Sequence, residues 1–295
     1  MPHWEMSWQL ATVVAGSMFA VAVLAWLPGR RTLAVAVPFL RETGLVVALY
    51  ALWQYAGTFA VMGTDGAGAR GEWIWQTERT WHLPSEAAVQ RLVLPHPLVV
   101  EAFNLYYATM HFTVLIIFLI WLFARHRDSY KQVRVTLVLL TGACLLIQLV
   151  PVAPPRLIGG VGLTDTAQVY GQSVYALGGG MADQLSAMPS VHVAWAMLVA
   201  VAVWRSTSSR WRWLAVAHAV ATWLVVVATA NHFWLDGIVA VVLLLLAWFA
   251  ACPISASLSA VAARAGTLAR RDLARPESTA DKLGVSADVR SLGVR

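Results

Sequence analysis

Seven apolar stretches, each close to the length needed to cross a lipid bilayer, dominate this sequence of 295 residues. Crossing ~30 Å of hydrocarbon takes about 20 helical residues. Irregular chain cannot do so, because its backbone polar groups would lack partners in lipid. The stretches are residues 8–27, 43–62, 102–124, 134–152, 190–205, 211–229 and 233–251. The sequence therefore predicts an all-α, integral membrane helical bundle.

The composition agrees with a chain that lies mostly in lipid. Hydrophobic residues make up 59% of the sequence, charged residues make up 12%, and the mean hydropathy is +0.65. Soluble domains carry about 25% charged residues. The first apolar stretch has no Lys or Arg before it, unlike a signal peptide, so we expect it to remain as a span. Cys144 and Cys252 lie in or at the end of spans and suggest neither a disulfide framework nor a thiolate metal site.

The basic residues are distributed unevenly over the connecting loops. With seven spans, 17 of the 21 Lys and Arg residues fall on one side of the membrane. They lie in residues 28–42, 124–134 and 205–212 and in the tail after residue 252. By the positive-inside rule this side is cytoplasmic, which places the amino terminus outside the plasma (inner) membrane. Orientation thus explains the net charge of +6, and we expect no nucleic-acid partner.

Four ionisable residues from three separate segments meet at the outer boundary of the predicted bundle. His192 begins the fifth span, and His232 and Asp236 begin the seventh, two crossings later. Arg156 follows the fourth span and therefore lies on the same side. A polar group without partners is costly in lipid, so side chains at this depth should be either satisfied by neighbours or used.

The residue types in this group suit phosphoryl transfer. His232 and Asp236 are four residues apart, so on one helix the carboxylate can hold one imidazole proton and leave the other nitrogen as a nucleophile. Ser190 stands where a helix cap belongs, and the amides of such a helix end attract anions. Arg156 adds a planar cation that suits phosphate oxygens. We interpret the group as an apparatus for transfer through a phosphohistidine, in which His192 handles protons.

The third span carries a polar face of its own. Asn104, Tyr107 and His111 are three and four residues apart, so they share one helical face near the outer end of that span. Such a face either contacts the substrate or forms hydrogen bonds between helices, and the sequence leaves both possibilities open. We count the three residues as candidate substrate-binding residues.

Several short motifs resemble those of a known superfamily. The motifs "PSVH" at 189–192 and "HFWLD" at 232–236 resemble the second and third signatures of the type 2 phosphatidic acid phosphatase superfamily, PSGH and SRxxxxxHxxxD. The elements "APPR" at 153–156, "DT" at 165–166 and "MPSVHVAWA" at 188–196 resemble the branch of inositol phosphorylceramide synthase and its bacterial homologues. The resemblance covers roughly residues 75 to 250.

This resemblance implies a role for each member of the group. It implies that His232 attacks phosphorus, that Asp236 supports it, and that His192 protonates the leaving oxygen and later activates the acceptor. It implies that Arg156 and Ser190 hold the phosphoryl oxygens. It also implies that the reaction needs neither a metal nor a cofactor.

The resemblance also implies a domain organisation. The core would have six spans within residues 43–251, preceded by an extra span and cytoplasmic loop in residues 1–42. The composition of residues 252–295, rich in Arg, Ala, Ser and Asp, predicts a basic cytoplasmic tail without regular structure. The chain departs from the broad superfamily pattern where Leu149, Leu157 and Val226 stand in place of Lys, Pro and Arg.

The sequence thus predicts a membrane enzyme that hydrolyses a lipid phosphate or diphosphate at the extracytoplasmic face. An alternative within the same class is a phosphotransferase that passes the phosphoryl or phospho-head group to an inositol or sugar hydroxyl. A metal site is a weaker use of the histidines, since no additional nearby His or Cys completes a ligand set. A membrane transporter is an alternative of another class, although transporters usually bind their substrate at the midplane and not at one edge.

Overall fold

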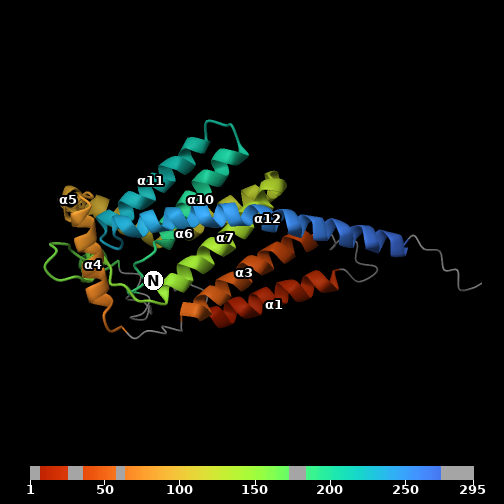
Figure 1. Ribbon diagram of the computed structural model, residues 1–295, viewed down its shortest axis with the longest axis horizontal. Coiled ribbons are helices and arrows are strands. Elements are labelled where there is room, and N and C mark those ends of the chain that lie inside the picture. The colour runs from red at the N-terminus through yellow and green to blue at the C-terminus, as the bar shows by residue number, and fades with distance from the viewer. Residues whose placement is uncertain (1–6, 26–35, 58–63, 173–183, 274–295) are drawn as a thin grey trace, which may run out of the picture. The chain divides into compact units, whose positions relative to one another are not determined.

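The computed structural model describes residues 7–25, 36–57, 64–172 and 184–273, and within them the chain is helical with no β-strand (Figure 1). The predicted all-α fold is confirmed for these residues. The elements are α1 (Trp8–Leu24), α3 (Val37–Gly57), α4 (Ala67–Thr80), α5 (Glu86–Val93), α6 (Pro97–Arg125), α7 (Arg127–Gln148), the 3₁₀ turn η1 (Pro155–Leu157), α8 (Thr166–Val169), α10 (Val191–Ser206), α11 (Arg212–Ala228) and α12 (Trp234–Leu273).

Within the described residues each predicted apolar stretch overlaps a helix, but the helices differ in length. Residues 26–27 and 58–62 of the first two stretches lie outside the described residues. Among the described residues, three helical segments are long and apolar enough to cross a membrane by themselves. They are Pro97–Arg125, Arg127–Gln148 and Trp234–Ser257. Three shorter apolar helices, α1, α10 and α11, have 16 or 17 residues. The structure thus indicates a membrane protein, and the count of six core spans plus one stays a prediction.

The core forms around α10, which packs against α6, α7 and α11. Small buried side chains such as Ala194 and Ala202 let these helices approach closely. Helix α11 also meets α12 at a close contact. A Cβ atom at Gly237 would lie 2.5 Å from the indole ring of Trp223, so only glycine fits there. This contact fixes the first turns of α12 against α11.

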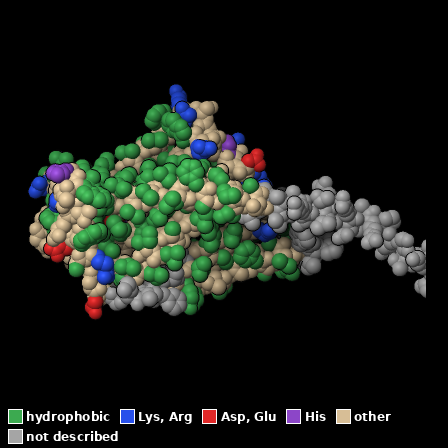
Figure 2. All heavy atoms as spheres, in the orientation of Figure 1, with side chains coloured by type: hydrophobic (Ala, Val, Ile, Leu, Met, Phe, Trp, Pro, Cys, Tyr) green, Lys and Arg blue, Asp and Glu red, His purple; other side chains and the backbone are tan. Residues whose placement is uncertain are grey.

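The surface of the helices is apolar as well. Figure 2 shows hydrophobic side chains over most of the visible face, with charged and histidine side chains toward its edges. Exposed examples are Ile117 on α6, Leu224 on α11 and Phe249 on α12. Helices that are apolar both inside and outside are typical of membrane bundles, where lipid covers the outer side chains.

The α1–α3 pair packs differently from the core. The two helices lie side by side along their length (Figure 1), and α3 also contacts α7. The residues where α1 and α3 touch are mostly small or apolar, and Gly44 lies against Met18 and Phe19. Near α7, Arg134 forms an ion pair with Glu42 of α3. These contacts attach the pair to the bundle through one helix.

Short segments beyond the ends of the long helices hold the candidate site together. The backbone of Val152 forms hydrogen bonds with that of Leu185 (N to O, 2.6 Å) and Ala187 (O to N, 3.2 Å). Helix α4 lies on the same segment, since a Cβ atom at Gly71 would lie 2.5 Å from the carbonyl oxygen of Ala153. The chain that precedes Arg156 is thus joined to the chain that precedes α10.

The carboxyl-terminal part of α12 differs from the expectation. The chain divides into two compact units after Ala251. Residues 252–273 continue the helix through Pro253, where the sequence predicts a tail without regular structure. Residues 274–295 lie outside the described residues. Cys252 is exposed on this helix, whereas Cys144 is buried in α7.

Candidate active site

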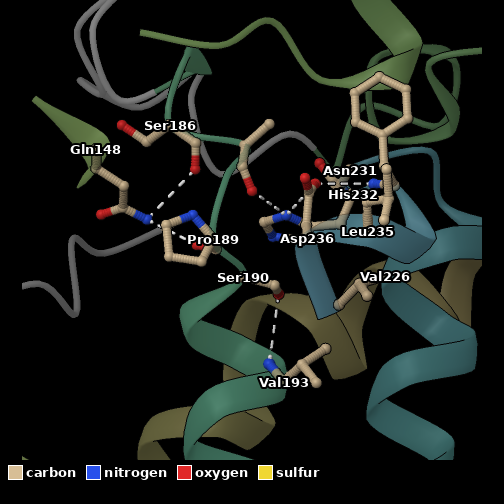
Figure 3. A network of polar contacts seen from close by, with 12 residues as sticks. Gln148, Ser186, Pro189, Ser190, Val193, Val226, Asn231, His232, Leu235 and Asp236 are labelled. Carbon is tan, nitrogen blue, oxygen red and sulfur yellow. Dashed lines mark hydrogen bonds and ion pairs between the residues drawn. The ribbon is translucent and has the colours of Figure 1, made fainter. Parts of the chain in front are cut away.

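His232 is held by two oxygen atoms at the same ring nitrogen. Its Nδ1 lies 2.7 Å from the carbonyl oxygen of Ala187 and 3.2 Å from Oδ2 of Asp236 (Figure 3). A carbonyl oxygen only accepts hydrogen bonds, so Nδ1 must carry the proton that both oxygens share. We infer this tautomer from the hydrogen-bond partners. The lone pair of the neutral ring is then on Nε2.

The position of Asp236 follows from the way α12 begins. The sequence places His232 and Asp236 on one helix, but α12 begins at Trp234, so His232 precedes the helix. Oδ2 of Asp236 accepts a hydrogen bond from the backbone N–H of Phe233 at 2.8 Å. Asp236 is the third residue of the helix and reaches back to the residue before the first, as in a capping box. The same oxygen that caps the helix therefore orients His232.

The other nitrogen of His232 is available for chemistry. The side chain is buried, with 4% of the residue exposed, and among the described residues Nε2 has no hydrogen-bond partner. The ring of His192 lies 5.7 Å from that of His232 between centroids. The two histidines that the sequence places on one side of the membrane are thus brought together.

His192 is set in aromatic surroundings. It is the second residue of α10, whose cap is Ser190: the serine hydroxyl accepts a hydrogen bond from the N–H of Val193 at 3.4 Å, as predicted for a helix start. Tyr107 stacks on the imidazole with a centroid distance of 4.3 Å and an interplanar angle of 21°. His111 lies at 4.3 Å on a tilted ring. The ring of His192 is therefore in contact with the rings of Tyr107 and His111 and lies near that of His232.

Arg156 lies next to this pair and is buried, with 3% of its side chain exposed. Its Nη1 donates to Oδ1 of Asn231 at 2.6 Å, and its Nε lies 3.2 Å from Oδ2 of Asp165. Its backbone N–H donates to the carbonyl of Ala230 at 3.1 Å. Arg156 is thus fixed to the two residues that precede His232, to Asn231 by its guanidinium and to Ala230 by its backbone.

The comparison with known families agrees with this geometry. The family model of the PAP2 superfamily matches residues 72–250, which contain both histidines, Asp236 and Arg156. The chain belongs to the PAP2 superfamily. Members of this superfamily are phosphoryl-transfer enzymes. No curated protein and no solved structure matches the chain. The superfamily is therefore shown, while the narrower branch is not confirmed.

Two features of the superfamily pattern are replaced by apolar residues in this chain. Leu149, at the position of the usual Lys, caps the end of α7. Val226, at the position of the usual Arg, is buried, and its carbonyl oxygen accepts hydrogen bonds from the backbone N–H groups of Asn231 and His232. Val226 thus supports the turn before α12 by its backbone and not by a charge.

The three candidate residues of the third span separate into two places. Tyr107 and His111 contact His192, and Nδ1 of His111 also lies 3.2 Å from the carbonyl of Tyr107. Asn104 instead accepts from the hydroxyl of Thr166 at 2.9 Å and donates to Oε1 of Gln172 at 3.1 Å. Both ends of its amide thus hold the segment after Asp165. Its role in substrate binding stays a prediction.

A small cavity lies between these residues and α11. Its volume is about 10 Å³, which is room for about one water molecule. It is lined by Tyr106, Tyr107, His111, His192, Thr222, Val225 and Val226. Polar groups on three helices therefore face a common space beside His192.

Sequence reasoning missed several contacts of the site. The carbonyl of Ala187 has no side-chain signal that could have indicated it. Asn231 and Asp165 were detectable in principle, because Asn231 is adjacent to His232 and Asp165 belongs to a motif of the resembling branch. Within the described ranges, no three His, Cys, Asp or Glu side chains gather as metal ligands.

Proposed function

We propose that this protein is a membrane phosphatase that hydrolyses a lipid phosphate or diphosphate at the extracytoplasmic face through a phosphohistidine on His232. The observation that supports this proposal most strongly is the paired acceptors at Nδ1, which leave the Nε2 lone pair for attack. A buried nucleophile with its orienting carboxylate, beside a second histidine, is the arrangement that nucleophilic catalysis requires.

In the first step, Nε2 of His232 attacks phosphorus and forms an N–P bond. The bond between phosphorus and the lipid oxygen breaks, and protonated His192 gives its proton to the leaving oxygen. The imidazolium that forms on His232 is stabilised by Asp236. In the second step, His192 takes a proton from water, the water oxygen attacks phosphorus, and the N–P bond breaks. Inorganic phosphate leaves, and both histidines return to their first state.

Charge on the phosphoryl oxygens requires donors. We assign this role to the guanidinium of Arg156 and to the amino-terminal end of α10 with its cap Ser190, because helix ends and planar cations both favour anions. Asp165 pairs with Arg156 in the structure, so a phosphate would compete with that carboxylate. The missing superfamily cations leave Arg156 with a larger share of this task.

A phosphotransferase remains the second candidate. The motif that contains Asp165 resembles the transferase branch, and in that reaction an inositol or sugar hydroxyl replaces water in the second step. The two functions share the phosphohistidine and differ only in the acceptor.

Replacement of His232 by Ala tests the nucleophile. Full-length protein in detergent micelles, given a panel of lipid phosphates and diphosphates with and without inositol, should release phosphate or form a phospho-acceptor, and His232→Ala should do neither. The identity of the product separates hydrolase from transferase. Circular dichroism and the thermal midpoint serve as folding controls. Retained turnover in a folded His232→Ala protein would contradict the assignment.

The side of the membrane is tested by labelling. Asp165→Cys, made in a Cys252→Ser background, should react with an impermeant thiol reagent added outside intact cells. Labelling only after the membrane is opened would contradict an extracytoplasmic site.

A further inference from the structure

A buried acidic pair lies behind the candidate site, outside the group described so far. Glu78 on α4 is 0% exposed and Glu86 on α5 is 1% exposed. Burial of a charged carboxylate is costly unless it is paired. The only nearby cation in the described residues that contacts both acids is Arg79, whose Nη2 lies 3.0 Å from Oε2 of Glu86 and 3.7 Å from Oε2 of Glu78. Two buried carboxyl groups therefore share one cation.

The hydrogen-bond pattern indicates that one of the two acids is protonated. In the described part of the chain, Oε2 of Glu78 and Oε1 of Glu86 have no hydrogen-bond partner as acceptors. A protonated carboxyl group is a donor, so one proton between the two acids would satisfy both oxygens. Burial, and after it the neighbouring Glu86, raise the pKa of Glu78 from 4.5 to about 9. Near neutral pH, the cluster then consists of one cation, one anion and one neutral acid.

The other oxygen of Glu78 reaches the catalytic element. Oε1 accepts a hydrogen bond from the backbone N–H of Leu235 at 2.6 Å. Leu235 is the second residue of α12 and directly precedes Asp236. Its N–H is one of the four at a helix start that have no partner within the helix. Glu78 therefore supplies a partner from outside, at the turn that positions His232.

Apolar packing connects the same elements. Ile74 of α4 packs in one buried cluster with Phe233, Leu235 and Ala187. Ala187 gives His232 its shorter hydrogen bond. The face of α4 that carries Glu78 thus contacts both segments that hold the nucleophile.

We propose that Glu78, neutral and hydrogen-bonded to Glu86, is a positioning residue that holds the first turn of α12 and thereby keeps His232 and Asp236 in their reactive arrangement. The proposal rests on the proposed function, because it assigns Glu78 to the support of that nucleophile. Glu78 touches neither substrate nor phosphorus.

The charged groups around Glu78 explain why its neutral form matters. Arg79 faces it from its own helix, Glu86 from α5, and Asp236 from α12 with His232 paired to that acid. Ionised Glu78 would add a third negative charge beside Glu86 and Asp236. Repulsion would then act on the turn that the hydrogen bond to Leu235 holds.

The kinetics of three variants distinguish a positioning role of Glu78 from a general effect of mutating α4. With dioleoyl phosphatidic acid in detergent micelles as the probe, Glu78→Ala should lower kcat by about 10²-fold with KM little changed, because misplacement of a catalytic group by ~1 Å costs that much. Glu78→Gln should restore kcat to within a few-fold, since its amide accepts from Leu235 and donates to Glu86. Glu72→Gln, an exposed change on the same helix, is the matched control and should leave kcat unchanged.

Two further readouts do not depend on turnover. Glu78→Ala should increase amide hydrogen exchange in the peptide 232–236, and Glu78→Gln should not. In infrared spectra of the full-length protein, Glu78→Gln should remove the carbonyl band of a protonated carboxyl group, while Glu72→Gln should keep it. If the wild type releases no phosphate from any lipid, the proposed function fails, and these readouts still decide the proposal. Unchanged exchange in Glu78→Ala, or a band that persists in Glu78→Gln, would overturn it.

Discussion

The two histidines of the site stand in opposite kinds of surroundings. Nδ1 of His232 is fixed by a carbonyl and a carboxylate at the start of α12, whereas His192 on α10 is surrounded by the rings of Tyr107, His111 and His232. A nucleophile must keep one tautomer and carry a positive charge in the intermediate, which a fixed anion supports. A proton-transfer group must gain and lose a proton in each cycle, which a permanent ion pair would hinder. The difference in surroundings thus matches the proposed difference in role.

Among substitutions that keep both histidines, replacement of Asp236 should lower kcat the most, because it changes the surroundings of His232. In Asp236→Asn, the amide keeps an oxygen for the N–H of Phe233 but loses the charge that balances the imidazolium of the intermediate. We expect kcat to fall by about 10³-fold, which is less than the ~10⁴-fold cost of losing the orienting Asp in a serine-protease triad. The loss is smaller because the carbonyl of Ala187 still holds the Nδ1 proton. Steady-state phosphate release measures this.

The shorter hydrogen bond to Ala187 O sets a limit on that loss. Since this oxygen still holds the Nδ1 proton, Asp236→Asn should retain the same His232 tautomer in nitrogen NMR spectra. If the tautomer changes instead, the carbonyl does not control it, and the two-acceptor description of His232 is wrong.

Replacement of His192 should have a different signature. His192→Asn should lower turnover of a lipid phosphate by about 10²-fold, which is typical for loss of a general acid or base. Formation of the phosphoenzyme should recover with a nitrophenyl phosphate ester, because that leaving group needs no proton. Rapid-quench detection of phosphohistidine is the measurement. An equal loss for both leaving groups would contradict the proton-transfer role.

Changes at Tyr107 should have the smallest effect and sharpen the description of the His192 side. Tyr107→Phe keeps the stacked ring and should change kcat by less than about 3-fold. Tyr107→Ala removes the stacking, which is worth about 1 kcal/mol, and should cost roughly 5-fold. If Tyr107→Phe proves as damaging as Tyr107→Ala, the hydroxyl acts on the substrate or on His192 directly.

The sequence predicts the positions of the apolar helices, because hydropathy determines which segments lie in lipid. Among the described residues every predicted apolar stretch overlaps a helix, because a chain in lipid has few alternatives. The start of α12 was less predictable, since "NHFWLD" has a helical spacing although His232 precedes the helix. The N–H of Phe233 donates a capping hydrogen bond to the carboxylate of Asp236, so the helix begins after Phe233. Residue spacing alone does not reveal this start.

The residues of the site likewise fall into those that the sequence indicates and those that it does not. The sequence indicates four of them, because an ionisable side chain at a membrane boundary is costly unless it is paired or functional. These are His192, His232, Asp236 and Arg156. The carbonyl of Ala187 was not recognised, because a backbone atom leaves no mark in the sequence. The acids Glu78 and Glu86 were not recognised either, because they belong to helices between the spans, and their burial becomes visible only when α4 packs on α12.

The hydrogen bond from His232 to the main-chain oxygen of residue 187 has a consequence for the tolerance of the site to sequence change. Point mutation at position 187 exchanges a side chain but leaves the oxygen in place, provided that the new group fits its buried surroundings. Insertions or deletions between residues 184 and 189 would move the oxygen itself. Residues 184–189 should therefore tolerate many substitutions, whereas a change in the length of this segment should impair the site.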